Sequence, residues 1–103
     1  MTSEKIKRLL NTAGSNFFIL HIEDLLSCDL SDPDVKNRKI SEYFREQHGF
    51  VSKDEYGIRV RINAVFRIIE AGAVNEAIEM INPDDPRILP EARNKVLELK
   101  VRI

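Results

Sequence analysis

The chain has 103 residues, of which 43% are hydrophobic and 32% are charged, and these values predict one globular domain rather than two. Its 16 basic and 17 acidic side chains leave a formal charge of -1, which argues against a strongly basic nucleic-acid-binding protein and against a disordered acidic tail. No run approaches the roughly 18 apolar residues of a membrane-spanning helix, and the first residues lack the apolar region of a secretory signal. We therefore expect no membrane association and a cytoplasmic location.

The first predicted helix covers residues 3–13. Its apolar side chains recur at helical spacing, Thr2 or Ser3 can serve as the N-cap, and Gly14 stands just beyond the last turn. This pattern is typical of a short amphipathic helix with one face in the core.

The next stretch, residues 15–26, is rich in apolar side chains and fits two structures. A buried helix capped by Ser15 or Asn16 is the preferred interpretation, because the apolar character continues over the whole stretch. A buried strand over residues 17–22 is the alternative, since a short apolar run by itself does not distinguish the two.

A third helix is predicted to begin at Pro33 and to end at Gly49. Asp32 can accept hydrogen bonds from the first free amide groups, and Pro33 lacks only an amide hydrogen that this position would not use. Gly49 supplies a residue that readily adopts the left-handed conformation of a helix end.

A fourth helix follows, with Ser52 and Glu55 as a capping box and Gly72 beyond its end at residue 70. Residues 58–62 also alternate as a strand would, but more positions follow the helical period. On this basis we expect Phe66→Ala to cost about 3 to 5 kcal/mol of stability. The predicted buried face consists of Ile58, Ile62, Val65, Phe66 and Ile69.

Two helices are predicted in the last third of the chain. Asn75 can cap a short one, and Pro90 can open a longer one that reaches residue 103. From residue 97 to residue 103 apolar and charged side chains also alternate, so a terminal strand is the alternative there.

The fold class predicted from all these segments is mostly α, a single compact domain of about five helices. The alternative is an α+β fold with strands at residues 17–22 and 97–103.

Residue types that carry catalysis or bind metals occur in this sequence only in weak patterns. His21, Glu23 and Asp24 include competent metal ligands, but their spacing does not bring three of them to one point. Cys28 and His48 lack any surrounding signature of a thiol enzyme, and a single cysteine excludes an internal disulfide. We therefore expect a protein that is not an enzyme and that has no metal site and no cofactor.

A stripe of polar residues is predicted on the outer face of the fourth helix, where Arg59, Asn63 and Arg67 recur at every fourth position. Arginine and asparagine side chains can bind phosphate oxygens or base edges, and the two flanking helices loosely outline a helix-turn-helix. The three side chains are therefore candidate binding residues, for a protein partner or, as the weaker possibility, for nucleic acid. A solvated face without a partner is the simplest interpretation.

The last predicted helix has more apolar side chains than one face can bury. Leu97 and Val101 point away from the ridge formed by Val96 and Leu99, and Val60 is a further apolar position beside the arginine stripe. An enclosed core helix would explain this surplus, as would an interface formed by Val60, Leu97 and Val101. The predicted function is therefore a small protein-interaction module or regulatory subunit, most simply a homodimer. A helix-turn-helix-like DNA-binding regulator is the alternative.

Overall fold

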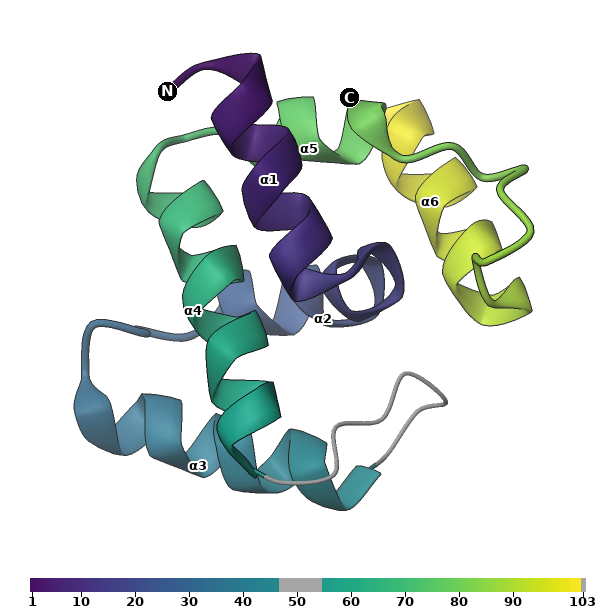
Figure 1. The fold of residues 1–103 in the computed structure, drawn as a ribbon. Coiled ribbons are helices and arrows are strands. Elements are labelled where there is room, and N and C mark those ends of the chain that lie inside the picture. Colours follow the sequence, from purple (N-terminus) through teal and green to yellow (C-terminus); the bar gives the residue numbers. More distant parts are fainter. Residues whose placement is uncertain (47–54, 103) are drawn as a thin grey trace.

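The computed structural model describes residues 1–46 and 55–102, which form six helices and no strand (Figure 1). The mostly α prediction is confirmed, and the strand alternatives are wrong within these residues because residues 17–22, 58–62 and 97–102 are all helical. The predicted helix end at Gly49 and the predicted cap at Ser52 lie outside the described residues. The helices are α1 (Ser3–Ala13), α2 (Ser15–Leu26), α3 (Pro33–Glu46), α4 (Glu55–Glu70), α5 (Val74–Met80) and α6 (Pro90–Arg102).

Helix ends follow the predicted caps at some positions and depart from them at others. Thr2 is the N-cap of α1, and its hydroxyl accepts the Lys5 amide at 3.2 Å. The caps predicted at Ser15 or Asn16 and at Asn75 are wrong, because α2 begins directly after Gly14 and α5 directly after Ala73. Gly14 and Ala73 occupy these N-cap positions instead, and neither has a side chain that can accept a hydrogen bond from the first free amides.

Asn16 instead ties the start of α2 to the segment before α6. Its side-chain amide donates to the Arg87 carbonyl at 3.0 Å, and its side-chain oxygen accepts the Leu89 amide at 2.9 Å. Two hydrogen bonds from one side chain satisfy backbone groups of an irregular segment that has no helix of its own. Asn16 thus helps to fix where α6 begins.

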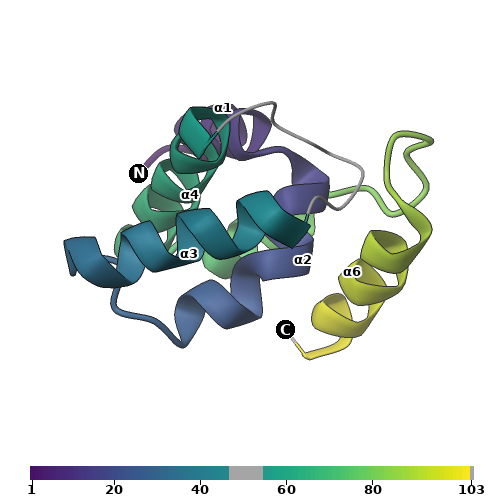
Figure 2. The ribbon, with the colours of Figure 1, turned by 90° about the horizontal axis from the view of Figure 1, so that it is seen from below.

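Helix α4 lies at the centre of the packing and contacts α1, α2, α3 and α5, most extensively α1 (Figures 1 and 2). Its predicted core positions Ile58, Ile62 and Val65 are buried. Phe66 and Ile69 are only partly buried, whereas Ala64 and Ile68, on the side of the helix away from Phe66, are buried. The buried face is therefore rotated from the predicted one, because helices pack on two sides of α4 and not on one.

Gly14 forms the entire connection between α1 and α2, with φ at 86°. Arg61 of α4 reaches this connection, where Nη1 donates to the Ala13 carbonyl at 2.6 Å and the guanidinium lies 6.0 Å from the centre of the Phe17 ring. No basic residue stands in the last turn of α1. Arg61 thus supplies, from another helix, the positive charge and the donor that a helix C-terminus favours.

Candidate functional site

The outward side of α6 carries an apolar pair that no other described segment covers. Val96 and Leu99 are buried against the rest of the molecule, whereas Leu97 is 48% exposed and Val101 is 87% exposed. The surplus predicted for a helical C-terminal segment is therefore present on the surface. Together with Asn94 and Pro90, which are also exposed and lie along the same side, Leu97 and Val101 form what we call the α6 outer face.

Charged side chains of opposite sign flank the α6 outer face. Arg93 and Lys100 lie along one flank, and Glu91 and Glu98 lie along the other, as their positions on the helix require. Arg93 pairs with Asp84 at 3.1 Å, and Glu98 pairs with Arg102. These pairs are exposed, so they hold the charges only weakly and leave them able to meet another molecule.

The arginine stripe lies on the outward side of α4, as its spacing predicts. Arg59 and Arg67 are exposed, Asn63 is partly buried, and Nη2 of Arg59 donates to the Asn37 side chain of α3 at 3.2 Å. Binding of a protein or of nucleic acid by these three residues stays a prediction.

Val60 is separated from the other two predicted interface residues. It lies on α4, while Leu97 and Val101 lie on α6, which stands apart from α4 at the right of both views (Figures 1 and 2). The three side chains therefore do not form one continuous surface.

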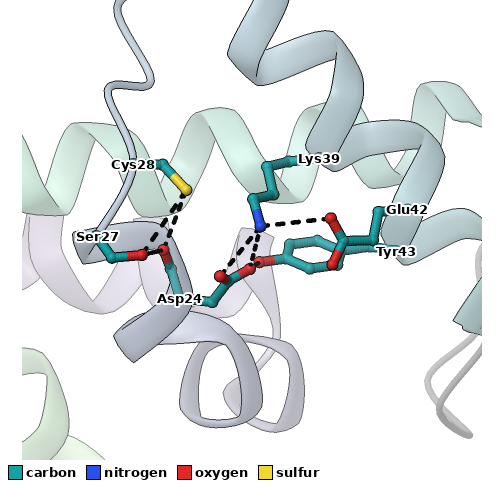
Figure 3. A network of polar contacts seen from close by, with 6 residues as sticks. All are labelled: Asp24, Ser27, Cys28, Lys39, Glu42 and Tyr43. Carbon is teal, nitrogen blue, oxygen red and sulfur yellow. Dashed lines mark hydrogen bonds and ion pairs between the residues drawn. The ribbon is translucent and has the colours of Figure 1, made fainter.

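A polar network joins α2 to α3 around Asp24 (Figure 3). Nζ of Lys39 lies 2.8 Å and 3.0 Å from the two carboxylate oxygens of Asp24, and the Tyr43 hydroxyl donates to the same carboxylate. Burial pushes the pKa of Asp24 upward, but the hydrogen bonds from Lys39 and Tyr43 outweigh this effect and hold that pKa below its ordinary value. Burial and the neighbouring Asp24 carboxylate raise the pKa of Tyr43, which stays protonated as a donor.

The three potential metal ligands of the second helix do not converge on one point. His21 is 5% exposed and stacks on the Tyr43 ring at 3.9 Å between centroids, while Asp24 belongs to the network just described. Glu23 faces α6, where it pairs with Lys95 and, at 3.0 Å, with Arg102. Within the described ranges no group of three such side chains is placed to hold a metal ion.

Cys28, the cysteine considered above as a candidate nucleophile, is partly buried, and its thiol donates to the Asp24 carbonyl at 3.2 Å.

We expect the Asp24 network to make the free energy of unfolding depend on pH in the acid range. Because the folded-state pKa of Asp24 lies below the ordinary value of 3.8, the network stabilises the protein above about pH 4, and this contribution is lost as the pH falls through the folded-state pKa. Asp24→Asn is expected to lower the free energy of unfolding at neutral pH and to flatten its decrease on acidification. Chemical denaturation at several pH values measures both effects. Glu79→Gln, at an exposed position on α5, is the control, and a profile of Asp24→Asn parallel to that of the parent protein would contradict the prediction.

A cavity of about 460 Å³ lies between α1 and the segment that joins α5 to α6. Its apolar lining consists of Leu10, Met80, Ile81 and Ile88, and its charged lining consists of Glu4, Lys7, Asp85 and Arg87. Asp85 and Arg87 pair with each other at 2.8 Å. Two acidic and two basic side chains balance in charge, so the lining favours no class of ligand.

The helices of the described residues include none that is both long enough and apolar enough to cross a bilayer. No protein-family model, no curated protein and no solved structure matches this chain.

Proposed function

We propose that this protein is a non-enzymatic interaction module of the cytoplasm that acts as a homodimer through the α6 outer face. The observation that supports the proposal is the exposure of Leu97 and Val101, at 48% and 87%, on a helix whose opposite side is already in the core. Packing against the core explains why Ala92, Val96 and Leu99 are apolar. It does not explain why the second ridge, Leu97 and Val101, is apolar as well.

A second copy of the chain is the partner that this surface fits. In a two-fold symmetric dimer each α6 outer face meets its own counterpart, so the apolar ridge needs no complementary groove elsewhere. The flanks of opposite sign on α6 supply matching charges at the rim, because the symmetry can place the basic flank of one helix beside the acidic flank of the other.

We expect Leu97→Glu combined with Val101→Lys to convert a dimer into a folded monomer. Two charges in the centre of the interface would lose their hydration on association, which raises the dimer dissociation constant by at least about 100-fold. Sedimentation velocity over a wide concentration range measures the assembly, and far-ultraviolet circular dichroism verifies that the helices remain.

The matched control places the same two substitutions at the same spacing on α4, where Val60 is partly buried. Tyr56 and Val60 on α4 are four residues apart, as Leu97 and Val101 are, and Tyr56 is 72% exposed. Tyr56→Glu with Val60→Lys is expected to leave the dimer intact. A parent protein that stays monomeric at high concentration, or a control that dissociates while the α6 variant does not, would overturn the proposal.

A further inference from the structure

We infer that the two α6 helices of the dimer pair in parallel and in register, as a short two-stranded coiled coil. This inference rests on the proposed function, since it specifies how the α6 outer face meets a second copy. Its support is the spacing and the charge of exposed residues on α6, together with the symmetry of a two-fold dimer.

The α6 outer face follows the spacing of a coiled-coil seam. Pro90, Asn94, Leu97 and Val101 are separated by four, three and four residues, and all four side chains are exposed. This spacing assigns Asn94 and Val101 to the first core position of the heptad, and Pro90 and Leu97 to the second. A β-branched residue at the first position and leucine at the second favour two strands.

Asn94 lies inside the seam, one turn from Leu97. An asparagine at the first core position lowers the stability of a coiled coil but favours the register in which it meets the asparagine of the partner helix, because the two amides can then bond to each other. In a parallel dimer the two Asn94 side chains stand face to face. An antiparallel pair with Leu97 at its centre sets Asn94 against an apolar position, which leaves the amide buried without such a bond.

The charges beside the seam favour parallel over antiparallel pairing of the two α6 helices. A two-fold axis along the helices brings the basic flank with Arg93 against the acidic flank with Glu98, five residues further along the partner helix, which is the usual separation for such pairs in parallel coiled coils. In the antiparallel dimer the two-fold axis is perpendicular to the helices. It brings the two basic flanks together, with Arg93 facing Lys100 of the partner helix, and it also brings the two acidic flanks together. Only the parallel orientation is therefore attractive on both sides of the seam.

The first test is a disulfide across the seam in a protein that carries Cys28→Ala. With Val101→Cys, parallel pairing places the two new thiols side by side, so air oxidation is expected to give a covalent dimer quantitatively. An antiparallel pair with Leu97 at its centre separates them by roughly 12 Å along the helix and would leave them unlinked. Lys5→Cys, at an exposed position on α1, is the control for random collision.

The second test exchanges charges, using sedimentation to measure the dimer dissociation constant. Arg93→Glu alone and Glu98→Arg alone each turn two attractive contacts into repulsive ones and are expected to raise that constant by about 3- to 10-fold. The double variant restores opposite charges and is expected to return to within about 2-fold of the parent protein. Asp84→Asn, which removes the partner of Arg93 within the same chain, is expected to leave assembly unchanged.

The outcomes distinguish this inference from the proposed function. If Leu97→Glu with Val101→Lys dissociates the dimer while Val101→Cys links no faster than Lys5→Cys, the surface is the interface and the parallel register is wrong. If the charge exchange fails to restore assembly, the register is likewise overturned. If the α6 variant leaves the dimer intact, both proposals fail together.

Discussion

Replacing Phe17 with alanine is expected to lower the free energy of unfolding by about 3 to 5 kcal/mol. Phe17 is 0% exposed at the start of α2, and its ring contacts His21 at 4.8 Å and the edge of the Tyr43 ring at 5.8 Å between centroids. Alanine would leave a cavity between α2, α3 and α4 that these stacked rings cannot fill without leaving their own positions. Urea denaturation followed by circular dichroism gives the difference in stability.

Phe66→Ala serves as the comparison that shows whether the large loss of stability is particular to the buried position of Phe17. Phe66 is only partly buried at the edge of the core, so its removal exposes less surface and leaves a site open to water, and we expect a loss of about 1 to 2 kcal/mol. The cost of 3 to 5 kcal/mol predicted for Phe66 from the sequence alone is lowered accordingly. Equal losses for the two variants would mean that the core is centred on the outer side of α4 rather than on α2.

Gly14→Ala is expected to cost about 2 to 4 kcal/mol, from two separate causes. The backbone at Gly14 has φ at 86° and ψ at 133°, a conformation that residues with a side chain rarely adopt. A Cβ at this position would stand 2.5 Å from Nη1 of Arg61, so the guanidinium would have to move and give up its hydrogen bond to the Ala13 carbonyl. Thermal and chemical denaturation measure the loss.

Gly72→Ala separates backbone strain from the displacement of Arg61. Gly72 also has positive φ, at 66°, and ends α4 with its amide bonded to the Ile69 carbonyl, but an added Cβ there meets no atom within 4 Å. We expect a loss of about 1 kcal/mol, for the strain alone. Arg61→Met should reproduce the remainder of the Gly14→Ala effect, and a Gly14→Ala variant no less stable than Gly72→Ala would show that the arginine contact contributes nothing.

Much of the architecture could be predicted from the sequence because it depends on local signals. Helical spacing of apolar residues, Thr2 before α1, Pro33 and Pro90 at the starts of α3 and α6, and Gly72 after α4 each act within a few residues of the chain. The choice of helix over strand for residues 17–22 also followed from the length of the apolar stretch, which exceeds that of an ordinary strand. Exposure of Leu97 and Val101 followed from the helical period once α6 was assigned as a helix.

Contacts between distant segments could not be predicted in this way. Nothing near Ala13 in the chain indicates that Arg61, 48 residues away, donates to its carbonyl, and nothing near Asp24 indicates that Lys39 and Tyr43 bind its carboxylate. The periodicity of α4 predicted one buried side. In the structure helices pack on two sides of α4, so Ile68 lies in the core and Phe66 lies at its edge. Such outcomes depend on how the helices cross, which is set by the fit of many side chains at once.

The sequence by itself therefore determined the helical class of the protein, the approximate positions of its helices and the apolar surplus of α6, because each of these is a property of one segment. Only the tertiary structure decided which surplus residues share a surface. It placed Val60 on α4, which stands apart from the α6 helix of Leu97 and Val101 (Figure 1), and it left Leu97 and Val101 exposed between flanks of opposite charge. The physical reason is that the spacing of residues along a helix fixes directions around its own axis, whereas the neighbours that meet each direction are fixed by the packing of the whole chain.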